Sequence, residues 1–258
     1  MSPAAILPAS ASLDLLERWS RVHAFAMLAA TGIALVAREA WPIALVGLSS
    51  VAALVITGAR SGARVGTAAN GVTALRLLFV TSLGLAALAP PSGLLVALAV
   101  LGIFVLDGVD GALARRFGAE SAFGARLDLE TDALLVLVVD FLLHAVWGYG
   151  VWVLVSGLLR YVYTLTLAVF PPPGGPAPRS RFARSSFGLF VTSRIAALAL
   201  PAAVAVPVAG LGSLLLWFSF ARSFFYAYAR PGVAPGEGAP IVDEALARDD
   251  AAPSDPRA

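Results

Sequence analysis

Long apolar stretches follow one another along almost the whole chain, and they constrain its fold more than any other feature. A helix needs about 20 apolar residues to cross the roughly 30 Å hydrocarbon core of a bilayer. Hydrophobic residues make up 59% of the chain and charged residues only 13%, which lies outside the range of soluble domains. The sequence therefore predicts an all-α, polytopic transmembrane helix bundle of about eight spans. They begin near Val22, Trp41, Asn70, Gly93, Leu127, Gly150, Phe187 and Val208.

The positive charges predict how these spans are oriented. The chain contains no lysine, and its arginines gather in every second connection between the apolar stretches. The other connections are short, and among them only the one with Arg38 carries a positive charge. Because cytoplasmic loops carry the excess of positive charge, we expect both termini and the segment 107–132 to face the cytoplasm. Abundant alanine, arginine, glycine and proline without lysine favour a bacterial source, and hence the inner cell membrane.

Charge and cysteine content exclude several classes of function. The formal net charge is only +2, and the arginines are spread over loops that flank the predicted spans. This distribution favours anionic lipid headgroups over nucleic acid as a partner. The absence of cysteine excludes disulfides, cysteine-based metal sites and thiol nucleophiles.

An acidic segment lies between two of the apolar stretches. Asp107 and Asp110 are three residues apart, and Asp128 and Asp132 are four apart, so each pair shares one face of a helix. Because the two helices are consecutive and antiparallel, we expect both pairs to meet just inside the cytoplasmic boundary. Each charge within a span costs about 2.5 to 3.5 kcal/mol on insertion scales, and like charges also repel one another. Divalent cations would neutralise such a cluster.

The residue types of this segment suit chemistry at phosphorus. Oxygen ligands without histidine or cysteine favour Mg²⁺, Mn²⁺ or Ca²⁺ over zinc. Two ions about 3.5 to 4 Å apart would suit an in-line displacement. Gly111 and Gly124 leave space for a nucleotide or pyrophosphate, and Arg115 offers a planar guanidinium to phosphate oxygens.

The segment as a whole resembles the signature of a known family. It reads D-x2-D-G-x2-A-R-x8-G-x3-D-x3-D, and it matches the signature of the CDP-alcohol phosphotransferase (phosphatidyltransferase) family of membrane enzymes at every fixed position. A second element, Asn70-x-x-Thr73-x-x-Arg76, is similar to the family's Asn-x-x-Thr-x-x-Arg element. Ala69 stands where the family usually has proline. The stretches from about Asn70 to Tyr228 correspond to the family's six-helix core.

The resemblance implies an enzyme of phospholipid synthesis. It would transfer a phosphoalcohol group from a CDP-linked donor, usually CDP-diacylglycerol, to an alcohol and release CMP, with Mg²⁺ or Mn²⁺ as cofactor. Asp132 would be a further metal ligand or the general base. The implied metal ligands are Asp107, Asp110, Asp128 and Asp132. The implied CDP-binding residues are Asn70, Thr73, Gly111, Arg115 and Gly124. A homodimer is also implied, because family members commonly form one.

The acceptor is left open by the sequence. Arg184 and Arg194 could hold an anionic acceptor such as an alcohol phosphate, or could anchor the chain by the positive-inside rule. Anchoring is favoured for Arg179 and Arg181, while Arg76 fits either task. Glycerol phosphate, inositol phosphate, inositol, serine and choline all remain within the resemblance.

The remaining predictions concern organisation. We divide the chain into an N-terminal interfacial helix and hairpin (1–62), the family core (63–229) and a disordered acidic tail (230–258). Asp140 and Arg160 are predicted to form a buried ion pair between neighbouring spans.

Two other functions compete with the enzyme. Acidic residues within spans are common in ion and proton pathways, so a transporter is one alternative. A family member without catalysis is another, although all four aspartates are present. The glycines and the arginine of the motif, for which an ion path has no need, favour the enzyme.

Overall fold

The computed structural model describes residues 9–60, 65–86, 88–89, 92–118, 121–173 and 180–229, and within these ranges every regular element is an α-helix. This confirms the all-α prediction. The helices are α1 (Ala9–Ala37), α2 (Trp41–Arg60), α3 (Ala68–Ala86), α4 (Gly93–Arg116), α5 (Ala122–Ala145), α6 (Trp152–Val169), α7 (Arg181–Ala199) and α8 (Ala202–Ala229). The predicted tail, 230–258, lies outside the described residues.

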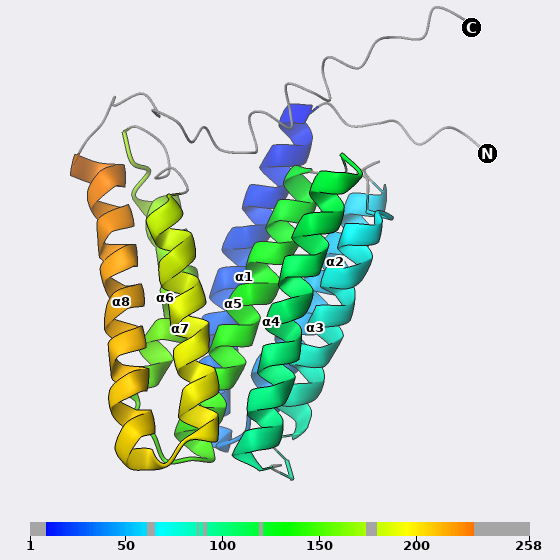
Figure 1. Ribbon diagram of the computed structural model, residues 1–258. Helices are drawn as coiled ribbons and strands as arrows, with labels where there is room; N and C mark the ends of the chain where they lie inside the picture. Colours follow the sequence, from blue (N-terminus) through cyan, green and yellow to red (C-terminus); the bar gives the residue numbers. More distant parts are fainter. Residues whose placement is uncertain are drawn as a thin grey trace, which may run out of the picture.

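Six of the eight helices are long and apolar enough to cross a membrane: α1 from Leu15, α2, α3, α4, α6 and α8. The chain is therefore an integral membrane protein. Among the predicted spans, α5 and α7 do not reach this apolar composition, because α5 carries several acidic residues and α7 three arginines. Both nevertheless run alongside the other helices (Figure 1).

Helix α5 forms the centre of the bundle. Its side chains are buried without interruption from Ala133 to Leu143, and a helix that is buried on all sides must be surrounded by others. It contacts α2, α3, α6 and α7. The N-terminal hairpin packs onto this arrangement, since α1 contacts α6 as well as α2.

Connections alternate between the two ends of the bundle. The start of α1, the end of α8 and the connection between α4 and α5 lie at one end (Figure 1). The α5–α6 and α7–α8 connections lie at the other. The acidic segment and the ends of the described chain therefore share one end, which is the arrangement that the arginine pattern predicted.

Several helices begin earlier than the apolar stretches do. α5 starts at Ala122, where the Ser121 hydroxyl caps it by accepting from the Gly124 amide at 3.0 Å. α7 starts at Arg181 after a similar cap by Ser180. A hydropathy pattern does not detect such polar first turns. Serine residues at the N-cap position do indicate where these helices begin. At the N-terminus, the predicted interfacial segment and the first span form one continuous helix, α1.

Candidate active site

Four aspartates from two helices converge on one arginine of a third. Asp107 and Asp110 come from α4, and Asp128 and Asp132 from α5. Nη1 of Arg76, on α3, lies 2.9, 2.7 and 2.7 Å from carboxylate oxygens of Asp107, Asp110 and Asp128. Nη2 of the same side chain donates to Asp132. The two acidic pairs therefore meet at one point, as their spacing predicted.

Three of these carboxylates could together hold a metal ion. Asp107, Asp110 and Asp128 each offer an oxygen, and these oxygens lie within 4.8 Å of one another. Hard oxygen ligands suit Mg²⁺ or Mn²⁺. Arg76 balances only one of the four aspartate charges, so the cluster retains a strong preference for further positive charge. These residues thus fit a divalent cation, with Asp132 one helical turn beyond Asp128.

Arg76 is the central residue whose role the sequence left undecided. Its side chain is 1% exposed and contacts all four aspartates. A charged side chain inside an apolar helix requires a partner of opposite charge. This requirement is the sequence signal that could have shown that Arg76 binds acidic residues. The pattern along α3 does not show which helices carry that partner.

Of the two predicted CDP residues of α3, Thr73 contacts the acidic cluster and Asn70 binds the chain just before the helix. The Thr73 hydroxyl donates to Oδ2 of Asp110 at 2.9 Å, which orients that carboxylate. Asn70 donates its side-chain amide to the carbonyl oxygen of Val65 at 3.1 Å. A Cβ atom at Gly124 would lie 2.8 Å from Oδ1 of Asn70, so this glycine lets α3 and α5 approach closely.

Gly111 and Arg115 form a pair on α4. Arg115 is exposed, and its Nη1 would lie 3.3 Å from a Cβ atom placed at Gly111. The guanidinium thus folds back over the glycine one turn earlier. Both residues lie within one turn or so of Asp110, on the helix that carries half of the acidic cluster.

A cavity of about 590 Å³ opens beside Asp128 and Asp132. It lies between α5, α6, α7 and α8, and three arginines line it. Arg184 was a predicted acceptor residue, Arg181 was predicted to anchor the chain, and Arg160 had been assigned to an ion pair elsewhere. The polar lining residues are Asp128, Asp132, Ser156, Arg160, Tyr163, Ser180, Arg181, Arg184, Ser219 and Ser223.

The predicted ion pair between Asp140 and Arg160 is wrong. Asp140 accepts from Nε of Arg194 at 2.5 Å, whereas Arg160 donates to Glu130 at 2.7 Å. Arg160 lies further than Asp140 from the connection between α5 and α6, so the two are not at equal depth. The prediction had compared only these two helices and had not considered a partner from α7.

Arg194 is committed to the interior of the protein. It is 1% exposed, and Nη1 donates to the carbonyl oxygen of Ala209 at 2.9 Å. Nη2 donates to the Ser213 hydroxyl at 2.7 Å. The guanidinium also lies 4.2 Å from the centre of the Phe190 ring. Arg194 does not line the cavity beside the acidic cluster, so the contacts that the structure shows for it are structural, and its role in acceptor binding stays a prediction.

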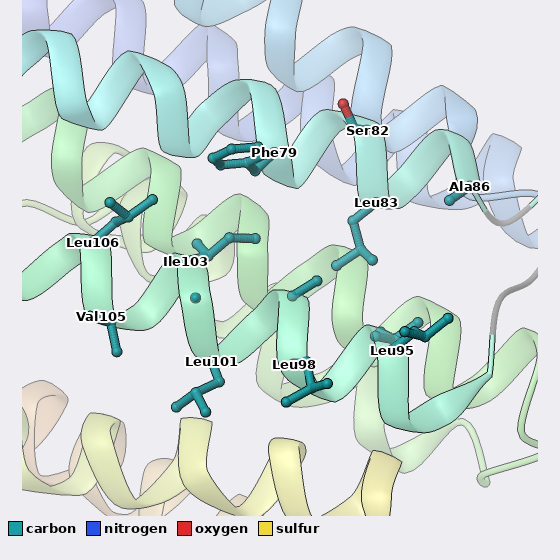
Figure 2. Close-up of a pocket in the computed structure, with 13 residues that line it drawn as sticks. Phe79, Ser82, Leu83, Ala86, Leu95, Leu98, Leu101, Ile103, Val105 and Leu106 are labelled. Atoms are coloured by element: carbon teal, nitrogen blue, oxygen red, sulfur yellow. The ribbon is translucent and has the colours of Figure 1, made fainter.

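An apolar groove of about 780 Å³ runs along the outer faces of α3 and α4 (Figure 2). Phe79 and Leu83 contribute from α3, and Leu98 and Leu106 from α4. The groove reaches Leu106, the residue immediately before Asp107. An apolar surface therefore leads along the bundle to the acidic cluster.

Fold and site together define an integral membrane protein with an acidic centre, an arginine-lined cavity that includes Asp128 and Asp132, and an apolar groove that ends at Leu106. Residues 66–225 match the family model of CDP-alcohol phosphatidyltransferase. The match spans more than half of the chain, and the protein belongs to this family. No curated protein and no solved structure gives a significant match.

Membership sets the reaction class and confirms the resemblance seen in the motif. The family consists of transferases that move phosphatidyl groups from CDP-alcohols in phospholipid synthesis, and it generally uses divalent metals. The matched region begins just before α3 and ends within α8, so α1 and α2 lie outside it.

Proposed function

We propose that the protein transfers a phosphatidyl group from CDP-diacylglycerol to the hydroxyl of a small alcohol phosphate and releases CMP. The observation that carries this proposal is the position of the acidic cluster. Two of its carboxylates line a cavity whose arginines suit a phosphate, and an apolar groove that suits acyl chains ends at Leu106, the residue before Asp107. A bilayer substrate and a polar substrate can therefore both approach the acidic cluster.

In this proposal, Asp107, Asp110 and Asp128 would hold Mg²⁺ or Mn²⁺, and Asp132, one helical turn beyond Asp128, is the carboxylate left to accept a proton. When bound, the metal neutralises the phosphate oxygens of the donor and orients them for displacement. Thr73 keeps the Asp110 carboxylate in position through its hydrogen bond. Arg76 balances part of the acidic charge and holds α3, α4 and α5 together at the site.

Asp132 acts as the general base, because it lines the cavity in which the acceptor binds. The acceptor oxygen forms a bond to the phosphorus that carries diacylglycerol, and its proton passes to the Asp132 carboxylate. The bond between that phosphorus and the bridging oxygen breaks, and CMP leaves with this oxygen. One bond forms and one breaks at phosphorus, so no oxidant or reductant is needed.

The CDP moiety lies over the first turns of α3 and α5 and the end of α4. Asn70, Gly111 and Gly124 form its surface, where glycine allows close approach of a ligand. Arg115 is exposed and can reach a phosphate oxygen of the donor. The acyl chains follow the groove between α3 and α4.

An anionic acceptor is supported by the charge of the cavity. Arg160, Arg181 and Arg184 line it, and guanidinium groups bind phosphate through paired hydrogen bonds. A cavity for serine or choline would not need three arginines. We therefore favour an alcohol phosphate over an uncharged alcohol.

We further propose that the site and both termini face the cytoplasm of a bacterial cell. The end of α2, the connection between α4 and α5, and the start of α7 lie at one end of the bundle (Figure 1). Their arginines, such as Arg60, Arg116 and Arg181, support this orientation by the positive-inside rule. A homodimer stays a prediction that rests on the family resemblance alone.

The proposed reaction is tested by measuring CMP release from purified protein in detergent. The assay contains CDP-diacylglycerol, Mg²⁺ or Mn²⁺ and one acceptor at a time, from glycerol phosphate and inositol phosphate to inositol, serine and choline. We expect CMP with an alcohol phosphate, none after chelation with EDTA, and a loss of at least 100-fold in Asp132→Asn, as is typical for removal of a general base.

A folded protein that binds Mn²⁺ but releases no CMP with any acceptor would contradict the proposal. A different CDP-linked donor would then be tried first, and transport second. Release of CMP with inositol or serine but with no phosphorylated acceptor would retain the reaction class and overturn the acceptor assignment.

A further inference from the structure

A buried polar cluster lies where α1, α5 and α6 meet. Glu130 of α5 is 2% exposed, and His23 of α1 is 1% exposed. The Glu130 carboxylate accepts from Nη2 of Arg160 at 2.7 Å and lies 3.8 Å from Nε2 of His23. Arg126, one turn earlier on α5, lies 3.7 Å from the same carboxylate. None of these residues belongs to the acidic cluster.

Glu130 faces away from the acidic cluster but remains close to it in sequence. It lies two residues after Asp128 and two before Asp132, and two residues turn an α-helix by about 200°. The helix that presents two aspartates on one face therefore presents Glu130 on the other. Its partner Arg160 then lines the cavity beside those aspartates.

Arg160 joins the buried polar cluster around Glu130 to the cavity beside Asp128 and Asp132. One nitrogen of its guanidinium is held by Glu130, while 16% of the side chain remains exposed at the cavity. Ordering a long, flexible side chain costs free energy when a ligand binds. A guanidinium that is already held in place avoids much of this cost, so Glu130 prepares Arg160 for an anion.

The N-terminal helix holds its histidine in one orientation. Nδ1 of His23 lies 2.8 Å from the Ser50 hydroxyl of α2, and the ring stacks on Trp19 with centroids 4.7 Å apart. Tyr161 of α6 meets the ring edge-on at 5.8 Å. Nε2, which points toward Glu130, has no hydrogen-bond partner among the described residues. The hairpin thus directs one polar atom at the carboxylate that holds Arg160.

Packing alone does not account for these residues. Burying a carboxylate and an imidazole where apolar side chains would fit costs free energy unless both are paired. Elsewhere α1 buries apolar side chains such as Ala24 and Met27 and the hydroxyls of Ser20 and Thr31, none of which can carry a charge. Among the described residues of α1, His23 is the buried titratable side chain, and it lies where α1 passes α5 and α6.

We propose that α1 and α2, which lie outside the matched family region, form part of the acceptor site through a chain of contacts from His23 to Glu130 to Arg160. His23 and Glu130 are positioning residues, and Arg160 is the group that meets the anion. This inference rests on the proposed function for the identity of the acceptor, but the anion site itself can be tested without turnover.

The first test measures binding of inorganic phosphate to the full-length protein in detergent by calorimetry. The variants are Glu130→Gln, which keeps the shape of the side chain, and His23→Ala. Met27→Ala is the matched control, because it removes a buried apolar side chain of α1 from the same helix. We expect up to about tenfold weaker binding in Glu130→Gln, because an Arg160 side chain that is no longer held must be ordered when phosphate binds, and a smaller loss in His23→Ala. Met27→Ala should bind phosphate as the wild type does, even if its melting temperature falls.

The second test separates the Michaelis constants in the CMP assay. Glu130→Gln and His23→Ala should raise KM for the phosphorylated acceptor while leaving KM for CDP-diacylglycerol unchanged. His23→Gln, which retains an amide donor near Glu130, should recover part of the loss. A merely structural role would alter both constants, or only the yield of folded protein, as in Met27→Ala.

Two results would overturn the inference: wild-type protein that does not bind phosphate, or phosphate binding that is equal in wild type, Glu130→Gln and His23→Ala. If Glu130→Gln does not fold, His23→Ala and His23→Gln decide the question alone. Phosphate binding that depends on Glu130 without any CMP release would retain this anion site and reject the proposed reaction. CMP release by the wild type, together with phosphate binding that is unchanged in Glu130→Gln and His23→Ala, would retain the proposed reaction and reject this anion site.

Discussion

Arg76 and Gly124 set the geometry of the acidic cluster at the scale of single residues. Arg76 draws carboxylates of α4 and α5 to α3. Gly124 lets the first turn of α5 lie against Asn70. One residue supplies charge and the other supplies space. Substituting the glycine tests the geometry without altering any charge.

Gly124→Ala should lower activity while the protein still folds. The new Cβ atom would lie 2.8 Å from Oδ1 of Asn70 and 3.2 Å from the Ser121 hydroxyl, so both side chains must shift. Such overpacking costs about 1 to 3 kcal/mol, partly offset by the helix propensity of alanine, which is about 1 kcal/mol better than that of glycine. We expect CMP release to fall at least tenfold, since misplacement by about 1 Å can cost that much or more.

Gly71→Ala is the control for this substitution. Gly71 is exposed on α3 beside Asn70, and no atom lies within 4 Å of a Cβ atom built there. Its activity should equal that of the wild type, and its melting temperature should not fall. Equal activity in Gly124→Ala and Gly71→Ala would show that the close approach of α3 and α5 does not matter for catalysis.

At the scale of elements, α5 is an acidic helix in the middle of the bundle, and three neighbouring helices each send it one arginine. Arg76 of α3 meets the acidic cluster, Arg160 of α6 meets Glu130, and Arg194 of α7 meets Asp140. These contacts lie at successive depths along α5. Because arginines of its neighbours balance these acidic residues, α5 can lie at the centre of a membrane protein, although its composition is too charged for it to be recognised as a span.

The deepest of these pairs predicts a loss of stability. Asp140 and Arg194 are almost fully buried, at 0% and 1% exposure. Asp140→Asn would leave the Arg194 charge without its counterion, and breaking a buried pair in this way costs about 3 to 5 kcal/mol. We expect a clearly lower melting temperature in detergent. The double variant Asp140→Asn/Arg194→Met, which removes both charges, should be more stable than Asp140→Asn alone. Unchanged melting of Asp140→Asn would contradict this account.

At the scale of the whole molecule, the sequence predicted contacts correctly where both residues lie on one helix or on two helices that follow each other in the chain. The meeting of Asp107 with Asp128 follows from two consecutive antiparallel helices, so spacing alone predicted it. The partners of Asp140 and Arg160 depend on which helices pack side by side, and no periodicity within one helix contains that information. The presence of Arg160 in the cavity, and the contact of His23 with α5, were missed for the same reason.

The orientation of the whole bundle gives the last prediction, and the chain is well suited to test it because it contains no cysteine. Phe117→Cys places a thiol in the exposed connection at the site end, and Val151→Cys places one in the exposed connection at the opposite end. Intact cells that express each variant are treated with a maleimide that does not cross membranes. Because the positive-inside rule puts the arginine-rich end in the cytoplasm, we expect Val151→Cys to be labelled directly and Phe117→Cys only after the cells are permeabilised. The parent chain should remain unlabelled throughout, and the reverse pattern would place the acidic cluster outside the cell, away from cytoplasmic CDP-linked donors.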